Sequence, residues 1–121
     1  MIEGQVTEER VPIIRIPIGG QVWPAVIDTG FNGFLELPEN LRTGVNAKFI
    51  GLVQSTLAAG QVIMEANYEV EFPFDGKQIQ AEATFASGDE ILIGTALLGE
   101  HRLEIDFIGK DVLLKRVTDA D

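Results

Sequence analysis

Two consecutive stretches of this chain alternate between apolar and polar residues, and this alternation constrains the fold more than any other feature. The apolar positions of the first stretch are Val62, Met64, Ala66, Tyr68, Val70, Phe72 and Phe74. Those of the second stretch are Ile79, Ala81, Ala83 and Phe85. A repeat of two residues places such side chains on one face of a β-strand. Asp75 and Gly76 separate the stretches and favour a tight turn. We therefore expect a β-hairpin with one buried face and one mostly acidic, solvated face.

Further β-strands are expected on both sides of this hairpin. They cover residues 11–18, 21–28, 47–57, 103–108 and 111–117. Turn residues separate them at intervals of about 8–12 residues, which is typical of a β-barrel or sandwich. Only the segment from Thr95 to Glu100 has a helical pattern, and it is short. The sequence thus predicts an all-β domain with one short α-helix near the C-terminus.

The composition restricts the partners and the compartment of the chain. With 121 residues it fits a single domain covering 1–121, and 45% of the residues are hydrophobic. Nine basic residues against nineteen acidic ones give a net charge of -10, which disfavours nucleic acids and anionic membranes. Cysteine is absent from the sequence, so disulfides and thiolate metal sites are excluded. No metal or other cofactor is expected.

The N-terminal segment has none of the features of a signal peptide. Residues 1–10 are largely polar and acidic, without the apolar centre of a signal sequence. No apolar run reaches the roughly 20 residues of a membrane span. We expect a cytoplasmic protein, and two interpretations of residues 1–10 remain: a strand that joins two subunits, or a flexible segment.

The segment Val26–Gly30 is the strongest candidate for chemistry. Two β-branched residues lead into Asp28, Thr29 and Gly30. The apolar lead places Asp28 at the end of a buried strand, where a carboxylate needs compensating hydrogen bonds. Thr29 can bond to nearby backbone, and Gly30 permits a tight turn. An ordinary turn at a strand end would give the same pattern.

A second segment changes the interpretation of the first. Ile91, Leu92, Ile93 and Gly94 form an apolar run that ends in glycine about sixty residues after Asp28. With both segments present, the sequence resembles the retropepsin-like aspartic peptidases, especially small bacterial members with a similar Asp-Thr-Gly-Phe-x-Gly stretch. The resemblance extends over about residues 11–117. It implies that the two segments cross in a ψ-shaped structure around the catalytic loop.

The resemblance also implies roles for individual residues. Asp28 corresponds to the catalytic carboxylate, and Thr29 and Gly30 correspond to residues that support the active-site loop. Asn32 and Gly33 occupy positions that contact the substrate backbone in the family. Ala58, Ala59 and Gly60 correspond to the tip of the flap, a hairpin that closes over the bound peptide. Small residues suit such a tip, because the backbone must approach the substrate closely.

A single Asp-Thr-Gly implies two chains. Peptide hydrolysis without a metal needs both a base and an acid, and two adjacent carboxyls that share one proton supply both. The sequence has one copy of the motif, so a symmetric homodimer must supply the second Asp28. We therefore expect a homodimeric aspartic endopeptidase that acts on peptides or proteins.

Some features leave alternatives open. Many family members carry Ala or Ser where this chain has Phe31, which motivates a second hypothesis of a peptide-binding or assembly module without catalysis. His101 is the only histidine, and we expect it to be exposed on the surface. The acidic face that includes Glu65, Glu69 and Glu71 is expected to be solvated charge.

Overall fold

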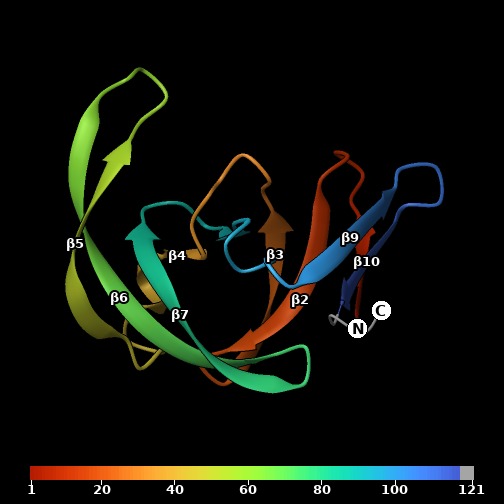
Figure 1. Cartoon of the computed structure of the whole chain (residues 1–121), viewed down its shortest axis with the longest axis horizontal. Coiled ribbons are helices and arrows are strands. Elements are labelled where there is room, and N and C mark those ends of the chain that lie inside the picture. Colours follow the sequence, from red (N-terminus) through yellow and green to blue (C-terminus); the bar gives the residue numbers. More distant parts are fainter. Residues whose placement is uncertain (118–121) are drawn as a thin grey trace.

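Ten strands form a single curved sheet in the computed structural model, which describes residues 1–117. One short 3-10 helix is also present. The strands are β1 (Ile2–Val6), β2 (Pro12–Ile18), β3 (Gln21–Ile27), β4 (Leu35–Pro38), β5 (Lys48–Thr56), β6 (Val62–Phe74), β7 (Lys77–Ala86), β8 (Ile91–Ile93), β9 (His101–Asp106) and β10 (Asp111–Arg116). The 3-10 helix η1 spans Glu39–Leu41. The order across the sheet is β5-β6-β7-β4-β8-β3-β2-β1-β10-β9 (Figure 1). The all-β prediction is confirmed.

Two of the hairpins, β6–β7 and β2–β3, form around two-residue turns. Phe74 pairs with Lys77 across the β6–β7 turn, where Asp75 and Gly76 have φ angles of 50° and 80°. The β2–β3 turn likewise has positive φ at Gly19 and Gly20. Turns with two positive φ angles match the twist of the strands that they join, and glycine adopts such angles without strain.

The centre of the sheet brings distant parts of the chain together. β8 pairs in parallel with β3, so that Ile93 lies opposite Ile27, and antiparallel with β4 on its other side. The chain therefore leaves β3, passes the end of β8 and returns in β4. The loops that follow β3 and β8 emerge at the same edge of the sheet. This arrangement is the ψ-shaped crossing expected for the two motifs.

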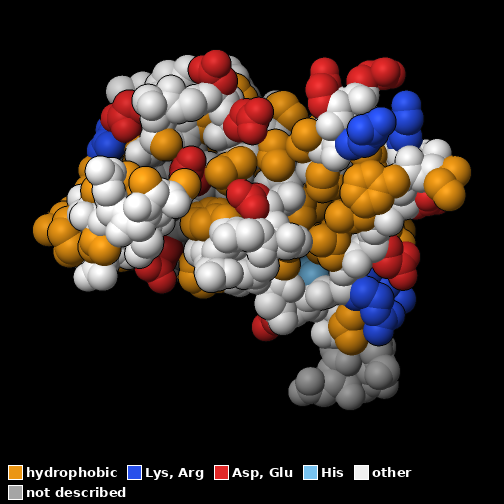
Figure 2. All heavy atoms as spheres, turned by 90° about the horizontal axis from the view of Figure 1, so that it is seen from above, with side chains coloured by type: hydrophobic (Ala, Val, Ile, Leu, Met, Phe, Trp, Pro, Cys, Tyr) orange, Lys and Arg blue, Asp and Glu red, His pale blue; other side chains and the backbone are white. Residues whose placement is uncertain are grey.

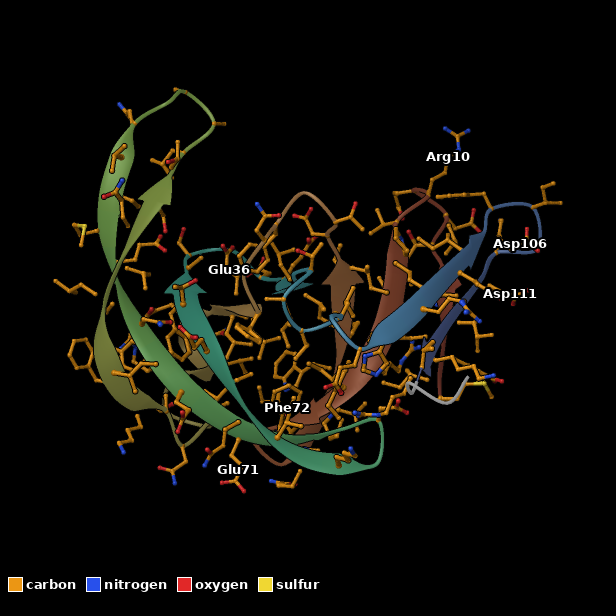
Figure 3. All side chains as sticks on the ribbon, viewed as in Figure 1. Arg10, Glu36, Glu71, Phe72, Asp106 and Asp111 are labelled. Carbon is orange, nitrogen blue, oxygen red and sulfur yellow. The ribbon has the colours of Figure 1, made fainter. Side chains whose placement is uncertain are left out.

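The core lies inside the curve of the sheet. Its fully buried side chains come from strands spread along the whole chain: Ile14, Leu35, Leu37, Phe72, Ile91, Ile93 and Leu114 are at most 1% exposed. On β6, Phe72 points inward while its neighbour Glu71 points outward (Figure 3). Burial of large apolar side chains provides most of the stabilisation of such a domain.

The burial of the apolar residues along β6 differs in part from the prediction. Val70, Phe72 and Phe74 are buried as expected, but Val62 and Met64 are 56% and 60% exposed. The first half of β6 leaves the core and pairs with β5 in a two-stranded arm (Figure 1). No core is available there, so the same face that is buried further along is exposed in the arm.

The short α-helix predicted for Thr95–Glu100 is wrong. These residues form consecutive turns, in which the amides of Leu97, Leu98 and His101 donate to the carbonyls three residues earlier. The first amides of the segment donate instead to the loop after β3, as described below. Six residues offer too few internal hydrogen bonds to offset helix nucleation.

The expectation of an exposed His101 is also wrong. Its side chain is 3% exposed, and Nε2 lies 3.2 Å from Oδ2 of Asp75, which is itself 4% exposed. Asp75 also accepts from the Met1 α-ammonium group, and Nε of Arg116 lies 3.8 Å from it. Because the β6–β7 turn reaches the ends of β9 and β10, it covers a histidine that local sequence places on the surface.

The N-terminal strand β1 lies within the sheet of this chain. It pairs with β10 on one side and β2 on the other. A β-carbon on Gly4 would lie 2.1 Å from the carbonyl oxygen of Ile13, so glycine permits this close approach. Among residues 1–117, the outermost strands of the sheet are β5 and β9. Within the same residues, no helix has the length and apolar composition required to cross a membrane.

Candidate active site

Asp28 follows β3 directly and is fixed by backbone hydrogen bonds. Its amide donates to the carbonyl of Ile93 at 2.9 Å, which continues the β3–β8 pairing by one residue. Its Oδ1 accepts from the amide of Gly30 at 3.0 Å, and its carbonyl accepts from the amide of Phe31 at 3.1 Å. These bonds hold a half-buried carboxylate in one orientation at the edge of the core.

The loop after β3 is attached to the loop after β8 along its length. Phe31 and Gly33 accept hydrogen bonds from the amides of Thr95 and Ala96, at 2.8 and 3.1 Å. The amide of Gly94 donates to the carbonyl of Phe34 at 3.0 Å. The two predicted motifs, far apart in the sequence, thus form one rigid unit around Asp28.

Glycines make this close packing possible. A β-carbon on Gly94 would lie 2.1 Å from the carbonyl oxygen of Gly33 and 2.8 Å from the Phe31 ring. A β-carbon on Gly33 would lie 2.7 Å from the same ring. The Phe31 side chain therefore packs against the two glycines and fills the space between the loops.

A cleft of about 610 Å³ lies between this loop and the β5–β6 arm. One wall consists of residues 30–36, which include Asn32 and Gly33. The opposite wall consists of Val53–Leu57 together with Glu65 and Asn67. Figure 1 shows the arm curving upward beside the loop that follows β3. An extended peptide would fit such an open groove between a floor and a hairpin.

The charged side chains that line the cleft are all acidic. They are Glu36 on β4, Glu65 on β6 and Glu82 on β7. Burial raises the pKa of Glu36, and repulsion from Glu65 and Asp28 raises this pKa further. Glu65 accepts a hydrogen bond from Ser55 at 3.0 Å, and Glu82 accepts one from Asn67 at 2.5 Å. On the face seen in Figure 2, blue Lys and Arg side chains gather mainly at the opposite end of the molecule, toward β9 and β10.

The hairpin between the two motifs forms as predicted. Its turn is closed by the amide of Leu57, which donates to the carbonyl of Gln61 at 2.7 Å, and by the amide of Gly60, which donates to the carbonyl of Leu57. Gly60 has a φ of 84°, so glycine suits this position. Ala58, Ala59 and Gly60 are exposed at the tip, beyond the residues that line the cleft. Their contact with a substrate stays a prediction.

No local sequence pattern indicates that acidic residues line a cleft. The sequence predicts Glu65 on a solvated face, and no motif includes Glu36 or Glu82. The alternation along 62–74 does place Glu65 and Met64 on opposite faces of the strand, but it cannot indicate that part of the strand leaves the core. Within residues 1–117, no three His, Asp or Glu side chains converge as metal ligands would.

Comparisons with known proteins show which solved structures share this architecture. No protein-family model matches the sequence, and no curated protein matches it either. A solved structure described as a retropepsin-like aspartic protease from Rickettsia conorii superimposes with a TM-score of 0.67, covering 94% of this chain and 89% of that chain. The chain has the retropepsin-like fold. The sequence identity is 16%, so the likeness concerns the fold.

Two viral structures share the retropepsin-like fold with this chain. The EIAV protease, complexed with the inhibitor HBY-793, matches with a TM-score of 0.57 and 14% identity, over 77% of this chain and 89% of that one. The foamy viral protease-reverse transcriptase, bound to an RNA/DNA hybrid, matches with a TM-score of 0.61 and 19% identity over 79% of this chain. This chain covers only 13% of the foamy viral one.

Proposed function

We propose that this chain is an aspartic endopeptidase that acts as a homodimer, with one Asp28 carboxyl contributed by each subunit. The observation that carries the proposal is the position of Asp28. Its backbone is held by Ile93, its carboxylate by Gly30, and the lining of the cleft begins two residues later in the same loop, at Gly30. Hydrogen bonds between the loops after β3 and β8, on either side of this carboxylate, support the proposal.

The proposed reaction requires two carboxyls that share one proton. The ionised carboxylate takes a proton from a water molecule while the water oxygen attacks the peptide carbonyl carbon. The protonated carboxyl donates its proton to the carbonyl oxygen. The tetrahedral intermediate collapses when the carbon–nitrogen bond breaks: the carboxyl that took the proton from water donates it to the leaving amine, and the other carboxylate accepts a hydroxyl proton, so that the pair again shares one proton. Two carboxyls a few Å apart do not both ionise, because their negative charges repel each other, so the pair keeps one shared proton over a range of pH.

A second copy of the chain would supply the other carboxyl. A twofold axis beside Asp28 would bring two copies together, and Thr29 and Gly30 are exposed next to it. β1 already pairs on both of its edges within one subunit. We therefore place the subunit contact at the Asp28 loop, with Thr29 meeting the partner's backbone, rather than at an added N-terminal strand.

The proposed substrate is an extended peptide between the loop and the β5–β6 arm. Backbone hydrogen bonds would position it as an added strand, and alternate side chains would enter the cleft. The carbonyl of Gly33 already accepts from Ala96, so contacts at Asn32 and Gly33 would use their other backbone groups.

The test is cleavage of a random peptide library at mildly acidic pH, by the natural chain and by Asp28→Asn. We expect cleavage that pepstatin inhibits and that the substitution abolishes, with unchanged circular dichroism. Asp89→Asn, which changes an exposed aspartate between β7 and β8, is the matched control and should cleave normally. Cleavage by Asp28→Asn would overturn the proposal. Peptide binding by both variants without turnover would support the alternative of a non-catalytic peptide-binding module.

A further inference from the structure

We propose that the cleft selects extended peptides with a Lys or Arg side chain at the position that lies between β4 and the β5–β6 arm. The inference rests on the proposed function, because it assumes that a peptide occupies this cleft. It adds a substrate class, and it assigns Glu36 and Glu65 as the residues that recognise the basic side chain.

The first observation is that the two glutamates come from opposite walls. Glu36 lies on β4 in the floor, and Glu65 lies on the inner face of the arm, where it pairs in register with Val53. Glu36 is the second residue of β4, and Figure 3 shows it between the arm and the loop after β3. A peptide side chain that enters from the open side would pass between the two carboxylates.

The second observation is that negative charge in the cleft is not compensated. Its lining includes three glutamates and no Lys, Arg or His. Burial and repulsion from Glu65 and Asp28 both disfavour the ionised form of Glu36, and no group in residues 1–117 donates a hydrogen bond to its carboxylate to offset them. Such an arrangement is unfavourable in the free protein and becomes favourable when a cation binds.

The third observation favours a basic side chain over a metal ion as the ligand of these glutamates. The glutamates do not converge into a metal-binding group within residues 1–117. Lys and Arg reach across a wider gap than a metal coordination sphere, and the Arg guanidinium can bond to two carboxylates at once. Ser55 and Asn67 hold Glu65 and Glu82 in fixed orientations, which favours recognition of a directed donor.

The experiment compares peptides that differ at one position only. A cleaved library peptide is resynthesised with Lys, Gln or Glu at each position in turn, and kcat/KM is measured for the natural chain, Glu36→Gln, Glu65→Gln and Glu71→Gln. Glu71 lies on the same strand as Glu65 but is exposed outside the cleft, so it serves as the matched control (Figure 3). We expect a preference for Lys over Gln of about tenfold at one position, as for a charge-assisted contact.

The ratio between peptides separates specificity from overall activity. Glu36→Gln and Glu65→Gln should each reduce the Lys preference at the same position, whereas Glu71→Gln should retain it. Equal cleavage of the Lys, Gln and Glu peptides would overturn the inference and leave the peptidase proposal standing.

Binding measurements cover the case without cleavage. The same labelled peptides are titrated with Asp28→Asn, alone and combined with Glu36→Gln, and fluorescence anisotropy is recorded. Binding that favours Lys and depends on Glu36 would support the inference even if the natural chain cleaves nothing. Binding without charge preference, or no binding at all, would overturn it.

Discussion

Gly94 and Gly33 approach so closely that a β-carbon on Gly94 would lie 2.1 Å from the Gly33 carbonyl oxygen. This contact joins the loop after β8 to the loop that carries Asp28. Gly94→Ala should separate the loops and destabilise the fold by about 3 kcal/mol, at the upper end of the usual cost of overpacking. Urea unfolding would measure the change. Gly88→Ala is the matched control, because nothing lies within 4 Å of a β-carbon added at that position. If the Gly94→Ala and Gly88→Ala variants were equally stable, the packing argument would be contradicted.

The proposed pairing of two Asp28 carboxyls predicts a dominant negative effect. When the natural chain is mixed with excess Asp28→Asn, mixed dimers should form and hold a single ionisable carboxyl at the centre. Activity per natural chain should then fall toward zero, while excess Asp89→Asn should leave it unchanged. Activity that persists in the mixture, together with a monomer in sedimentation experiments, would exclude a shared site.

The change of environment along β6 predicts unequal effects of two substitutions. Phe72 is 1% exposed in the core, so Phe72→Ala should cost about 3–5 kcal/mol of unfolding free energy. Met64 is 60% exposed on the outer face of the arm, so Met64→Ala should change stability by less than about 0.5 kcal/mol. Thermal unfolding would measure both. A large loss from Met64→Ala would show that another surface covers the arm in solution.

The raised pKa of Glu36 predicts a stability effect that depends on pH. In the folded chain this pKa lies above the ordinary value of 4.5, because of burial and of repulsion from Glu65 on β6 and Asp28 after β3. The folded state then disfavours the ionised carboxyl, so stability decreases as pH rises from below 4.5 through the folded pKa. Glu36→Gln should be more stable than the natural chain at pH 7 and equally stable well below pH 4.5.

Unfolding of both proteins in urea across this pH range would test the effect. Glu71→Gln should show no such gain. A Glu36→Gln variant that is less stable than the natural chain at pH 7 would contradict the assignment of Glu36 as a strained carboxylate.

Asp75 predicts the opposite dependence. Hydrogen bonds from the Met1 ammonium group and His101 lower its pKa below 3.8 despite burial. The folded state favours the ionised carboxylate, so its contribution is complete above 3.8 and is lost as pH falls through the folded pKa. Asp75→Asn should therefore destabilise the chain at pH 6, and progressively less as the pH falls below 3.8 through the folded pKa. Asp89→Asn is the exposed control, and an equal loss at both pH values would exclude an ionic contribution.

Much of the fold follows from local patterns in the sequence. The alternation over 62–85, with a turn at Asp75 and Gly76, predicts the β6–β7 hairpin, and the retropepsin-like motifs predict the crossing of β3 and β8. These features depend on residues that are close in sequence or on two motifs with a recognisable order. Strand β4 has only four residues and no clear alternation, so the same reasoning did not find it.

Other features are decided by contacts between distant segments. The segment Thr95–Glu100 has a helical pattern, but its first amides bond to Phe31 and Gly33, and turns result. His101 is polar and isolated in sequence, yet the β6–β7 turn covers it and supplies Asp75.

The acidic cleft is the clearest case in which the tertiary structure decides. The sequence by itself determined that Asp28 ends a buried strand and that an apolar run ending in Gly94 follows, because both are written in neighbouring residues. It did not determine that Glu36, Glu65 and Glu82 would face one groove. Whether a face of a strand meets core, solvent or a cleft depends on what the whole sheet places opposite it, and in this chain the β5–β6 arm places a groove there.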